Sequence, residues 1–359
     1  MQIKQRAAAL KKLGDFLGNF TDKNYAAIEI TEEEKVFYEV LEQSVSRLQE
    51  QNPWFTPAFV RHALKEWAEA LSPENIDKWL SAYVFPEEEP LRTVGLVLAG
   101  NIPLVGMHDW ITTLMSGNRA LVKMSSSDNK LLPLLEKYLG FVEPAFRGRT
   151  VFTDGLMRNI DAVIATGSNN SARYFEYYFG KYPHIIRKNR NGTAVLTGEE
   201  TKEDLSGLAD DIFLYFGLGC RNVTKIFVPK NFDLNRIFEA SLKYSHLVNH
   251  RKYKNNYDYY RAVYLMSTDE DERQSLLENG LLLLKKDTGY ASPVGVVFYE
   301  RYHDLDEVKQ ILQHDAEKIQ TIVSRADIDG AIPFGTTQKP ALWDYADGVD
   351  TMDFLLHLQ

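Results

Sequence analysis

Apolar and polar positions follow a helical period through residues 1–91 of the chain. Three candidate helix starts carry capping signals, and these are Thr31 with Glu34, Thr56 with Pro57, and Ser72 with Pro73. The first start predicts a helix that reaches about Gln51, and the third predicts a helix over 76–83. We therefore expect 1–91 to form an N-terminal helical segment.

From Arg92 the pattern changes to short apolar runs that alternate with amphipathic segments. The apolar runs predict strands at 93–99, 120–124, 150–152, 161–165 and 193–196, and the segments between them predict helices at 103–116, 131–139 and 171–179. Strands separated by helices are typical of an α/β fold with a doubly wound parallel sheet. Such sheets bind ligands at the carboxyl ends of their strands, so we expect 92–198 to be a nucleotide-binding domain.

A second α/β unit is predicted after Glu199. Its elements are a helix at 205–216, a turn with the one cysteine, a strand at 223–228, a helix at 234–244, a polar tyrosine-rich stretch at 246–260, strands at 262–266 and 294–299, and a helix at 305–312. We expect 199–331 to be the catalytic domain and 332–359 to be a tail that returns to the core. The N-terminal helical segment is expected to pack on the nucleotide-binding domain.

Composition restricts the partners and the location of the protein. The net charge is −9 with no long basic stripe, so nucleic acid is not expected as a partner. The most apolar segment, 94–105, is interrupted by Gly100, Asn101 and Pro103 and is too short to cross a bilayer. The N-terminus lacks the apolar core of a signal peptide, and one cysteine allows no intrachain disulfide, so we expect a cytoplasmic protein. The basic run 187–190 is expected to be a solvated loop, or to meet a phosphate. No metal site is predicted, and the sequence leaves open whether the chain forms a homo-oligomer.

Cys220 is the one thiol of the chain and the main candidate for chemistry. Gly217 and Gly219 precede it, and the predicted strand at 223–228 follows. Glycines permit a backbone turn that presents a side chain, and a thiolate is a strong nucleophile. A single cysteine is more often a small buried hydrophobe, so the turn alone leaves both interpretations open.

Polar residues also follow three predicted strands of the first α/β region. Asn101 follows the strand at 93–99, where its amide could donate a hydrogen bond or simply form a turn. Lys123 ends the strand at 120–124 and suits an anionic or ribose-bearing ligand, or solvent. Gly167 and Ser168 lead from a strand into a helix, where free backbone amides can hold a phosphate.

Taken in order, these segments resemble the aldehyde dehydrogenase superfamily. The matching motifs are Asn101-Ile-Pro103, Lys123, Thr166-Gly-Ser168 and Gly219-Cys220. Within the superfamily the chain is most similar to the bacterial-luminescence type of fatty acyl-CoA reductase, through the segments 216–226, 292–300 and 332–335. The resemblance extends from about Arg92 to the C-terminus.

The resemblance implies NADPH-dependent reduction of an acyl-CoA thioester to an aldehyde through a thioacyl intermediate on Cys220. It also implies that the Asn101 amide and the Cys220 backbone N–H form the oxyanion hole. The residues implied in cofactor binding are Lys123 and Ser126 for the adenosine ribose, and Gly167 and Ser168 for the pyrophosphate.

Three departures from the superfamily pattern refine this expectation. The stretch 187–192 stands where aldehyde-oxidising members carry a water-activating glutamate, and it holds no carboxylate. A bound thioester should therefore resist hydrolysis and exchange with thiols, which fits a CoA-linked reaction. Ser126 stands where NAD-preferring members carry an acidic residue that would repel a 2′-phosphate, so NADPH is favoured and NADH stays open. The segment 289–293 lacks the glutamate that holds the nicotinamide ribose.

Two other functions are compatible with the same residues. One is cysteine-dependent acyl transfer without redox chemistry, and the other is a non-catalytic protein that binds acyl-CoA or a nucleotide. Oxidation of NADPH in the presence of acyl-CoA separates the reductase from both. The length of the acyl chain cannot be read from the sequence.

Overall fold

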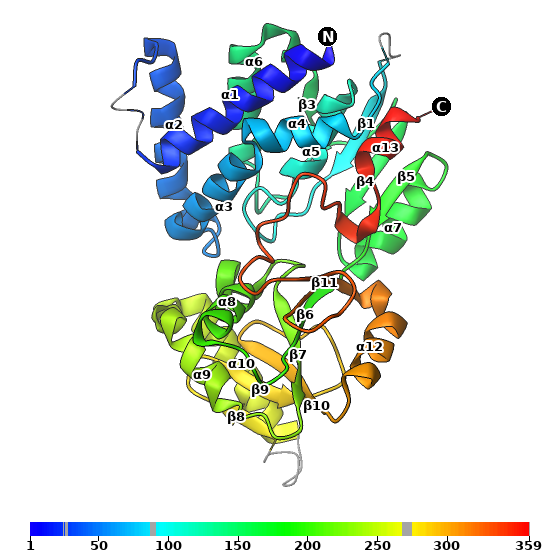
Figure 1. The fold of residues 1–359 in the computed structure, drawn as a ribbon. Helices are drawn as coiled ribbons and strands as arrows, with labels where there is room; N and C mark the ends of the chain where they lie inside the picture. Colours follow the sequence, from blue (N-terminus) through cyan, green and yellow to red (C-terminus); the bar gives the residue numbers. More distant parts are fainter. Residues whose placement is uncertain (24, 26–27, 87–90, 268–274, 359) are drawn as a thin grey trace. The chain divides into compact units, whose positions relative to one another are not determined.

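A computed structural model describes residues 1–23, 25, 28–86, 91–267 and 275–358. The chain divides into two compact units, each described here by itself (Figure 1). The first unit comprises Met1–Lys188 and Pro340–Gln359, and the second comprises Asn189–Lys339. No helix in the described part of the chain is long and apolar enough to cross a membrane.

A five-stranded parallel sheet with strand order β3-β2-β1-β4-β5 forms the centre of the first unit. Its strands are β1 (Thr93–Val97), β2 (Arg119–Lys123), β3 (Thr150–Phe152), β4 (Ala162–Thr166) and β5 (His184–Arg187), and its connecting helices are α5 (Met107–Met115), α6 (Leu131–Val142) and α7 (Asn169–Phe179). The order reverses between β1 and β4, as in doubly wound nucleotide-binding sheets. The predicted α/β fold is confirmed.

Alternate side chains of these strands supply the two faces of the sheet. Val94 and Leu96 of β1 belong to the large core that includes the N-terminal helices, α5 and α6. Val97 packs instead in a separate cluster with Phe175 and Phe179 of α7. Because both of their faces are covered, β1, β2 and β4 read as largely apolar runs, and the sequence predicts them. Strand β5 was not predicted.

Four helices precede the sheet, and these are α1 (Ile3–Thr21), α2 (Glu32–Gln51), α3 (Pro57–Ala70) and α4 (Pro73–Ser81). The three predicted capping signals are all used. The hydroxyls of Thr31, Thr56 and Ser72 accept hydrogen bonds from backbone N–H groups three residues ahead, at 3.1, 3.3 and 3.3 Å. These caps satisfy donors that a helix N-terminus otherwise leaves open.

The C-terminal segment is part of the first unit. It ends in α13 (Thr351–Leu356), and Trp79 donates a hydrogen bond to the hydroxyl of Tyr345 at 2.7 Å. Arg187 of β5 lies 2.5 Å from Asp109 of α5 in a buried ion pair and donates to the Thr351 hydroxyl at 3.0 Å. Arg187 is thus a buried structural residue, and the prediction of a solvated or phosphate-binding loop is wrong for it, because β5 extends through this position.

The second unit contains a seven-stranded sheet with order β12-β11-β6-β7-β10-β9-β8, parallel except for the β8–β9 pair. Its strands are β6 (Asn191–Val195), β7 (Val223–Pro229), β8 (Leu276–Glu278), β9 (Leu283–Lys286), β10 (Val296–Tyr302), β11 (Ile319–Ser324) and β12 (Ala331–Ile332). Its helices include α8 (Lys202–Phe213), α9 (Asn235–Ser241), α10 (Arg251–Ser267) and α12 (Leu305–His314). Strand β6, which the sequence analysis counted with the nucleotide-binding strands, pairs here with β7 and β11.

The predicted strand at 262–266 is wrong, because these residues continue helix α10. Tyr253 and Tyr257 lie one helical turn apart and are both 1% exposed. Tyr260 and Tyr264, on the next turns, pack against the cluster that contains Tyr257. Aromatic and β-branched residues favour strands in isolation, but here tertiary packing of one helix face decides the structure.

Candidate active site

Cys220 lies, partly buried, on the turn that joins helix α8 to strand β7 of the second unit. The backbone turns sharply after α8, because Tyr215, Phe216 and Gly217 all have positive φ, at 54°, 60° and 74°. L-residues other than glycine rarely adopt this left-handed conformation, which costs roughly 1–2 kcal/mol for each of them. Strained backbone of this kind persists only where surrounding contacts hold it, and it gathers at functional sites.

Burial holds the two strained aromatic residues in place. Tyr215 and Phe216 are both buried, and the Phe216 ring lies 4.4 Å from the His250 ring and 6.0 Å from the Tyr253 ring between centroids. A cavity of about 20 Å³ adjoins Phe216 and Gly217. This volume is about that of one water molecule, so the cavity as it stands does not hold an acyl chain.

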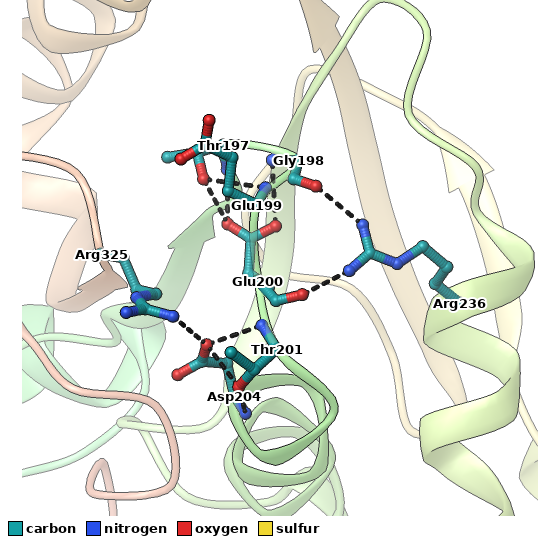
Figure 2. A network of polar contacts seen from close by, with 8 residues as sticks. All are labelled: Thr197, Gly198, Glu199, Glu200, Thr201, Asp204, Arg236 and Arg325. Carbon is teal, nitrogen blue, oxygen red and sulfur yellow. Dashed lines mark hydrogen bonds and ion pairs between the residues drawn. The ribbon is translucent and has the colours of Figure 1, made fainter.

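The loop before α8 is fixed by a buried carboxylate (Figure 2). Glu200, 3% exposed, accepts hydrogen bonds from the Thr197 N–H at 2.6 Å, the Thr197 hydroxyl at 2.9 Å and the Gly198 N–H at 3.0 Å. Arg236 donates to the carbonyls of Gly198 and Glu200 from the other side. The connection from β6 to α8 is therefore held by the side chains of Thr197, Glu200 and Arg236.

The first turn of α8 is a capping box. Thr201 accepts a hydrogen bond from the Asp204 N–H at 3.1 Å, and Asp204 accepts one from the Thr201 N–H at 2.8 Å (Figure 2). Arg325 pairs with the same Asp204 carboxylate at 2.7 Å. The first turn of α8 is therefore fixed by side chains, and the Cys220 turn follows the opposite end of this helix.

The other predicted site residues meet at one edge of the first unit's sheet. Asn101 follows β1, Lys123 is the last residue of β2, and Gly167 and Ser168 follow β4. β1 pairs with both β2 and β4, and the strand order reverses between β1 and β4. In doubly wound sheets this edge is where dinucleotides bind.

The turn after β4 lies against the first turns of helix α7. A Cβ atom on Gly167 would come within 2.9 Å of Ser171 and of Phe175, so only glycine lets the chain pass this close to α7. The Ser168 hydroxyl caps α7 by accepting a hydrogen bond from the Ser171 N–H at 3.2 Å. No acidic residue lies in the first turn of α7, so the partial positive charge of its N-terminus is available to an anion.

The structure distinguishes between the serines that follow β2. Ser125 packs against Gly100, where an added Cβ would lie 2.6 Å from its hydroxyl oxygen, and it accepts a hydrogen bond from the Ser127 N–H at 3.2 Å. Ser126 and Ser127 are exposed. The exposed Lys123 ammonium donates to the Gly155 carbonyl at 3.5 Å. Ser126 and Ser127, unlike Ser125, thus present exposed side chains at this edge.

Asp128 holds the loop that carries Asn101. Its carboxylate accepts a hydrogen bond from the Leu104 N–H at 2.8 Å, and Leu104 has a left-handed φ of 57°. Burial raises the pKa of Asp128 to about 6, although the Leu104 bond lowers it. One carboxylate therefore stabilises a strained loop conformation at a desolvation cost.

Asp128→Asn should flatten the pH dependence of stability between about pH 4 and pH 6. A carboxyl whose pKa is raised on folding binds its proton more tightly in the folded state, so its contribution falls as pH rises through this window, by up to about 3 kcal/mol. Asparagine keeps an oxygen for the Leu104 N–H and removes the buried charge. Urea denaturation at several pH values measures the slope, and a slope as steep as in wild type would contradict the role given to Asp128.

A family model described as acyl-CoA reductase (LuxC) matches residues 8–254, which include Cys220 and all the predicted site residues. The chain belongs to this family. The sequence resemblance to the bacterial-luminescence type of acyl-CoA reductase is thereby confirmed. The match begins at residue 8, so the N-terminal helices are part of the acyl-CoA reductase (LuxC) region, whereas the sequence resemblance began at about Arg92.

Two curated relatives are both named long-chain acyl-protein thioester reductase. The chain is 22% identical over 289 residues to the long-chain acyl-protein thioester reductase of Photorhabdus laumondii, covering 73% of this chain and 57% of that protein. It is 24% identical over 276 residues to the long-chain acyl-protein thioester reductase of Vibrio harveyi, covering 68% and 56%. The chain thus spans little more than half the length of these relatives.

Solved aldehyde dehydrogenases share the fold of this LuxC-family chain. Aldehyde dehydrogenase 21 from Physcomitrella patens, in complex with succinate, has a TM-score of 0.65 at 12% identity over 99% of this chain and 85% of that one. An aldehyde dehydrogenase from Bacillus cereus, in complex with NAD⁺, has a TM-score of 0.58 at 12% identity over 91% and 73%. The predicted aldehyde-dehydrogenase-like fold is confirmed.

Sequence reasoning missed the residues that support the site. Glu200 and Asp128 carry no motif, since each acts on backbone groups that a helix or strand pattern does not reveal. A weak signal existed for Glu200, because Thr197-Gly-Glu-Glu200 follows a buried strand directly. Asp128 acts on Leu104, 24 residues away, and no local pattern predicts such a contact.

Proposed function

We propose that this chain reduces a fatty acyl thioester to an aldehyde, with Cys220 as the covalent carrier of the acyl group. The observation that carries the proposal is the position of the chain's one thiol on a strained helix-to-strand turn, in a member of the acyl-CoA reductase (LuxC) family. The aldehyde-dehydrogenase-like fold supports the same chemistry.

The Cys220 side chain itself carries out the acyl transfer. The Cys220 thiolate attacks the thioester carbonyl carbon, a new C–S bond forms as the bond to the donor sulfur breaks, and the donor leaves as a thiolate that takes a proton from solvent. NADPH, when bound, supplies the hydride that reduces the thioacyl carbon. The thiohemiacetal then releases the aldehyde as its C–S bond breaks, which regenerates the Cys220 thiolate.

The cofactor would bind at the carboxyl edge of the five-stranded sheet. The Gly167–Ser168 turn and the N-terminus of α7 fit the pyrophosphate, while Lys123 and Ser126 would hold the adenosine ribose. The exposed Ser126 and Ser127 lie three and four residues after Lys123, and the nearest acid in sequence, Asp128, is turned inward to Leu104. This supports NADPH over NADH, because Ser126 and Ser127 carry no carboxylate that would repel a 2′-phosphate.

Ser126→Glu should lower the ratio of kcat/KM for NADPH to that for NADH. A carboxylate beside the ribose accepts hydrogen bonds from a free 2′-OH and repels a 2′-phosphate. Ser127→Glu is the matched exposed variant, and Ser125→Glu tests the inward position. If none of the three substitutions lowers the ratio, the ribose site is misplaced.

Hydrolysis of the thioacyl group is not favoured. The 187–192 stretch, where a water-activating glutamate would stand, consists of the end of β5 and the start of β6, and Arg187 within it is committed to Asp109. Without a base for water in this stretch, the thioacyl carbon is left to hydride or to a second thiol.

The donor thiol is either CoA or a protein. The family description names acyl-CoA, and the curated relatives are named for acyl-protein thioesters, and the chemistry at Cys220 is the same for both. The decisive assay follows NADPH absorbance with acyl-CoA and, separately, with an acylated carrier protein. Oxidation of NADPH with aldehyde formation supports the reductase. Acyl exchange without NADPH oxidation would show that the chain is an acyltransferase. If neither oxidation nor acyl exchange occurs, the chain is a binding protein without either activity.

A further inference from the structure

The side chain of Asn222 joins the end of helix α8 to the residue that precedes Cys220. Asn222 is fully buried. Its amide oxygen accepts a hydrogen bond from the Gly219 N–H at 2.8 Å, and its amide nitrogen donates to the carbonyls of Asp211 at 2.8 Å and Leu214 at 3.1 Å. The amide therefore spans the whole strained turn with three hydrogen bonds.

These partners are groups that the strained turn itself leaves open. The carbonyls at the end of a helix need donors from outside it, and the left-handed residues after Leu214 lead the backbone away from α8. Asn222 provides both donors. A Cβ atom on Gly219 would lie 2.9 Å from the Asn222 amide oxygen, so the contact also requires glycine beside the cysteine.

The main chain of Asn222 fixes the direction of the Cys220 N–H. The Asn222 N–H donates to the Gly219 carbonyl at 3.0 Å, and the Asn222 carbonyl accepts from the Gly192 N–H of β6 at 2.9 Å. The Gly219 carbonyl and the Cys220 N–H belong to one planar trans peptide, so they point in opposite directions. With the carbonyl held toward Asn222, the Cys220 N–H is directed away from it.

A second segment of the same unit braces this arrangement. The buried Asp211 carboxylate accepts hydrogen bonds from the Gly335 N–H at 2.7 Å and the Thr337 N–H at 3.1 Å. The amide of the adjoining Gln338 lies 3.3 Å from where a Cβ of Gly219 would be. Gly219 is thus enclosed between the amides of Asn222 and Gln338.

We propose that Asn222 is the positioning residue of the Cys220 nucleophile. Its side-chain amide ties Gly219 to the end of helix α8, and its main-chain N–H holds the Gly219 carbonyl, and together these contacts orient the thiol and the Cys220 N–H. This inference rests on the proposed role of Cys220. Asn222 itself is buried beneath the turn and is assigned no contact with the substrate. Its loss should therefore affect the chemical step more than substrate binding.

Asn222→Asp is the sharpest test, because it keeps the shape and the acceptor for Gly219 but turns a carboxylate oxygen toward two carbonyls. We expect kcat for aldehyde formation to fall roughly 10²-fold with little change in KM, since a displacement of about 1 Å has this cost. The rate at which iodoacetamide alkylates Cys220, measured by mass spectrometry of the protein, should also be lower in the variant than in wild type. Asn222→Ser, which is neutral and too short to reach Leu214, should have the same effects in weaker form and serves if the aspartate variant does not fold.

Asn118→Asp is the matched control. Asn118 is buried in the first unit and also donates through its amide nitrogen, to the Ser116 hydroxyl at 2.9 Å and the Leu355 carbonyl at 3.3 Å. This variant should lower the melting temperature and leave the alkylation rate of Cys220 unchanged. If folded Asn222 variants lose melting temperature only, with wild-type alkylation and kcat, Asn222 is merely structural and the proposal is overturned.

The experiment separates failure of this inference from failure of the proposed function. Iodoacetamide reports the state of the thiol without any turnover. If wild type forms no acyl adduct yet the Asn222 variants alkylate slowly, the positioning stands and the proposed reaction falls. If wild type forms the adduct and the variants alkylate as wild type does, the reaction stands and the positioning falls.

Discussion

Replacing Cys220 with alanine is expected to abolish aldehyde formation from a fatty acyl thioester. The thiolate is the proposed covalent carrier, and no second cysteine exists in the chain to take its place. The substitution removes one sulfur atom from a partly buried position, and the turn around it is held by Asn222, Tyr215 and Phe216. The variant should therefore fold, with a melting temperature close to that of wild type.

Mass spectrometry of the whole protein gives an unambiguous measurement. After mixing with an acyl thioester, wild type should gain the mass of one acyl group, and the alanine variant should gain none. Cys220→Ser is a useful companion, because it keeps a side chain of similar size with a much weaker nucleophile. An alanine variant that still produces aldehyde at the wild-type rate would refute covalent catalysis by Cys220.

The sequence was sufficient for the features that depend on local pattern. Strands β1, β2 and β4 of the nucleotide-binding sheet are apolar because both of their faces are covered, and capping residues mark the starts of three helices in the sequence. Helix α10 shows where local pattern fails. Tyr264 and Val263 favour a strand by propensity, but the packing of Tyr257, Tyr260 and Tyr264 on one helix face stabilises a helix instead.

The candidate site divides in the same way. Cys220 and the strand ends at Asn101, Lys123 and Gly167 stand out because glycines and polar residues end apolar runs. The residues that hold them do not stand out. Asp211 binds a segment 124 residues away, and the Arg187–Asp109 pair spans 78 residues. A single sequence contains no signal for such distant contacts, so only the structure reveals which residues are paired.

Asn101→Ala is expected to lower kcat by roughly 10²–10³-fold with a modest change in nucleotide affinity. The resemblance that assigns Asn101 to the oxyanion hole predicts a loss of about 2.7–4 kcal/mol of transition-state stabilisation, which is typical when one such donor is removed. Asn101 lies in the first unit and Cys220 in the second, so the assignment rests on the resemblance and stays a prediction.

The competing interpretation is that Asn101 only shapes its loop, and the structure makes the two separable. That loop is already held on both sides of Asn101, by the packing of Gly100 on Ser125 and by the hydrogen bond from Leu104 to Asp128. The loop backbone therefore has supports other than the Asn101 side chain. Asn101→Asp keeps the shape without a donor, so it should lose kcat as the alanine variant does. A turn residue would instead show a lowered melting temperature and near-normal kcat in both variants, and measuring the two quantities together decides which role Asn101 has.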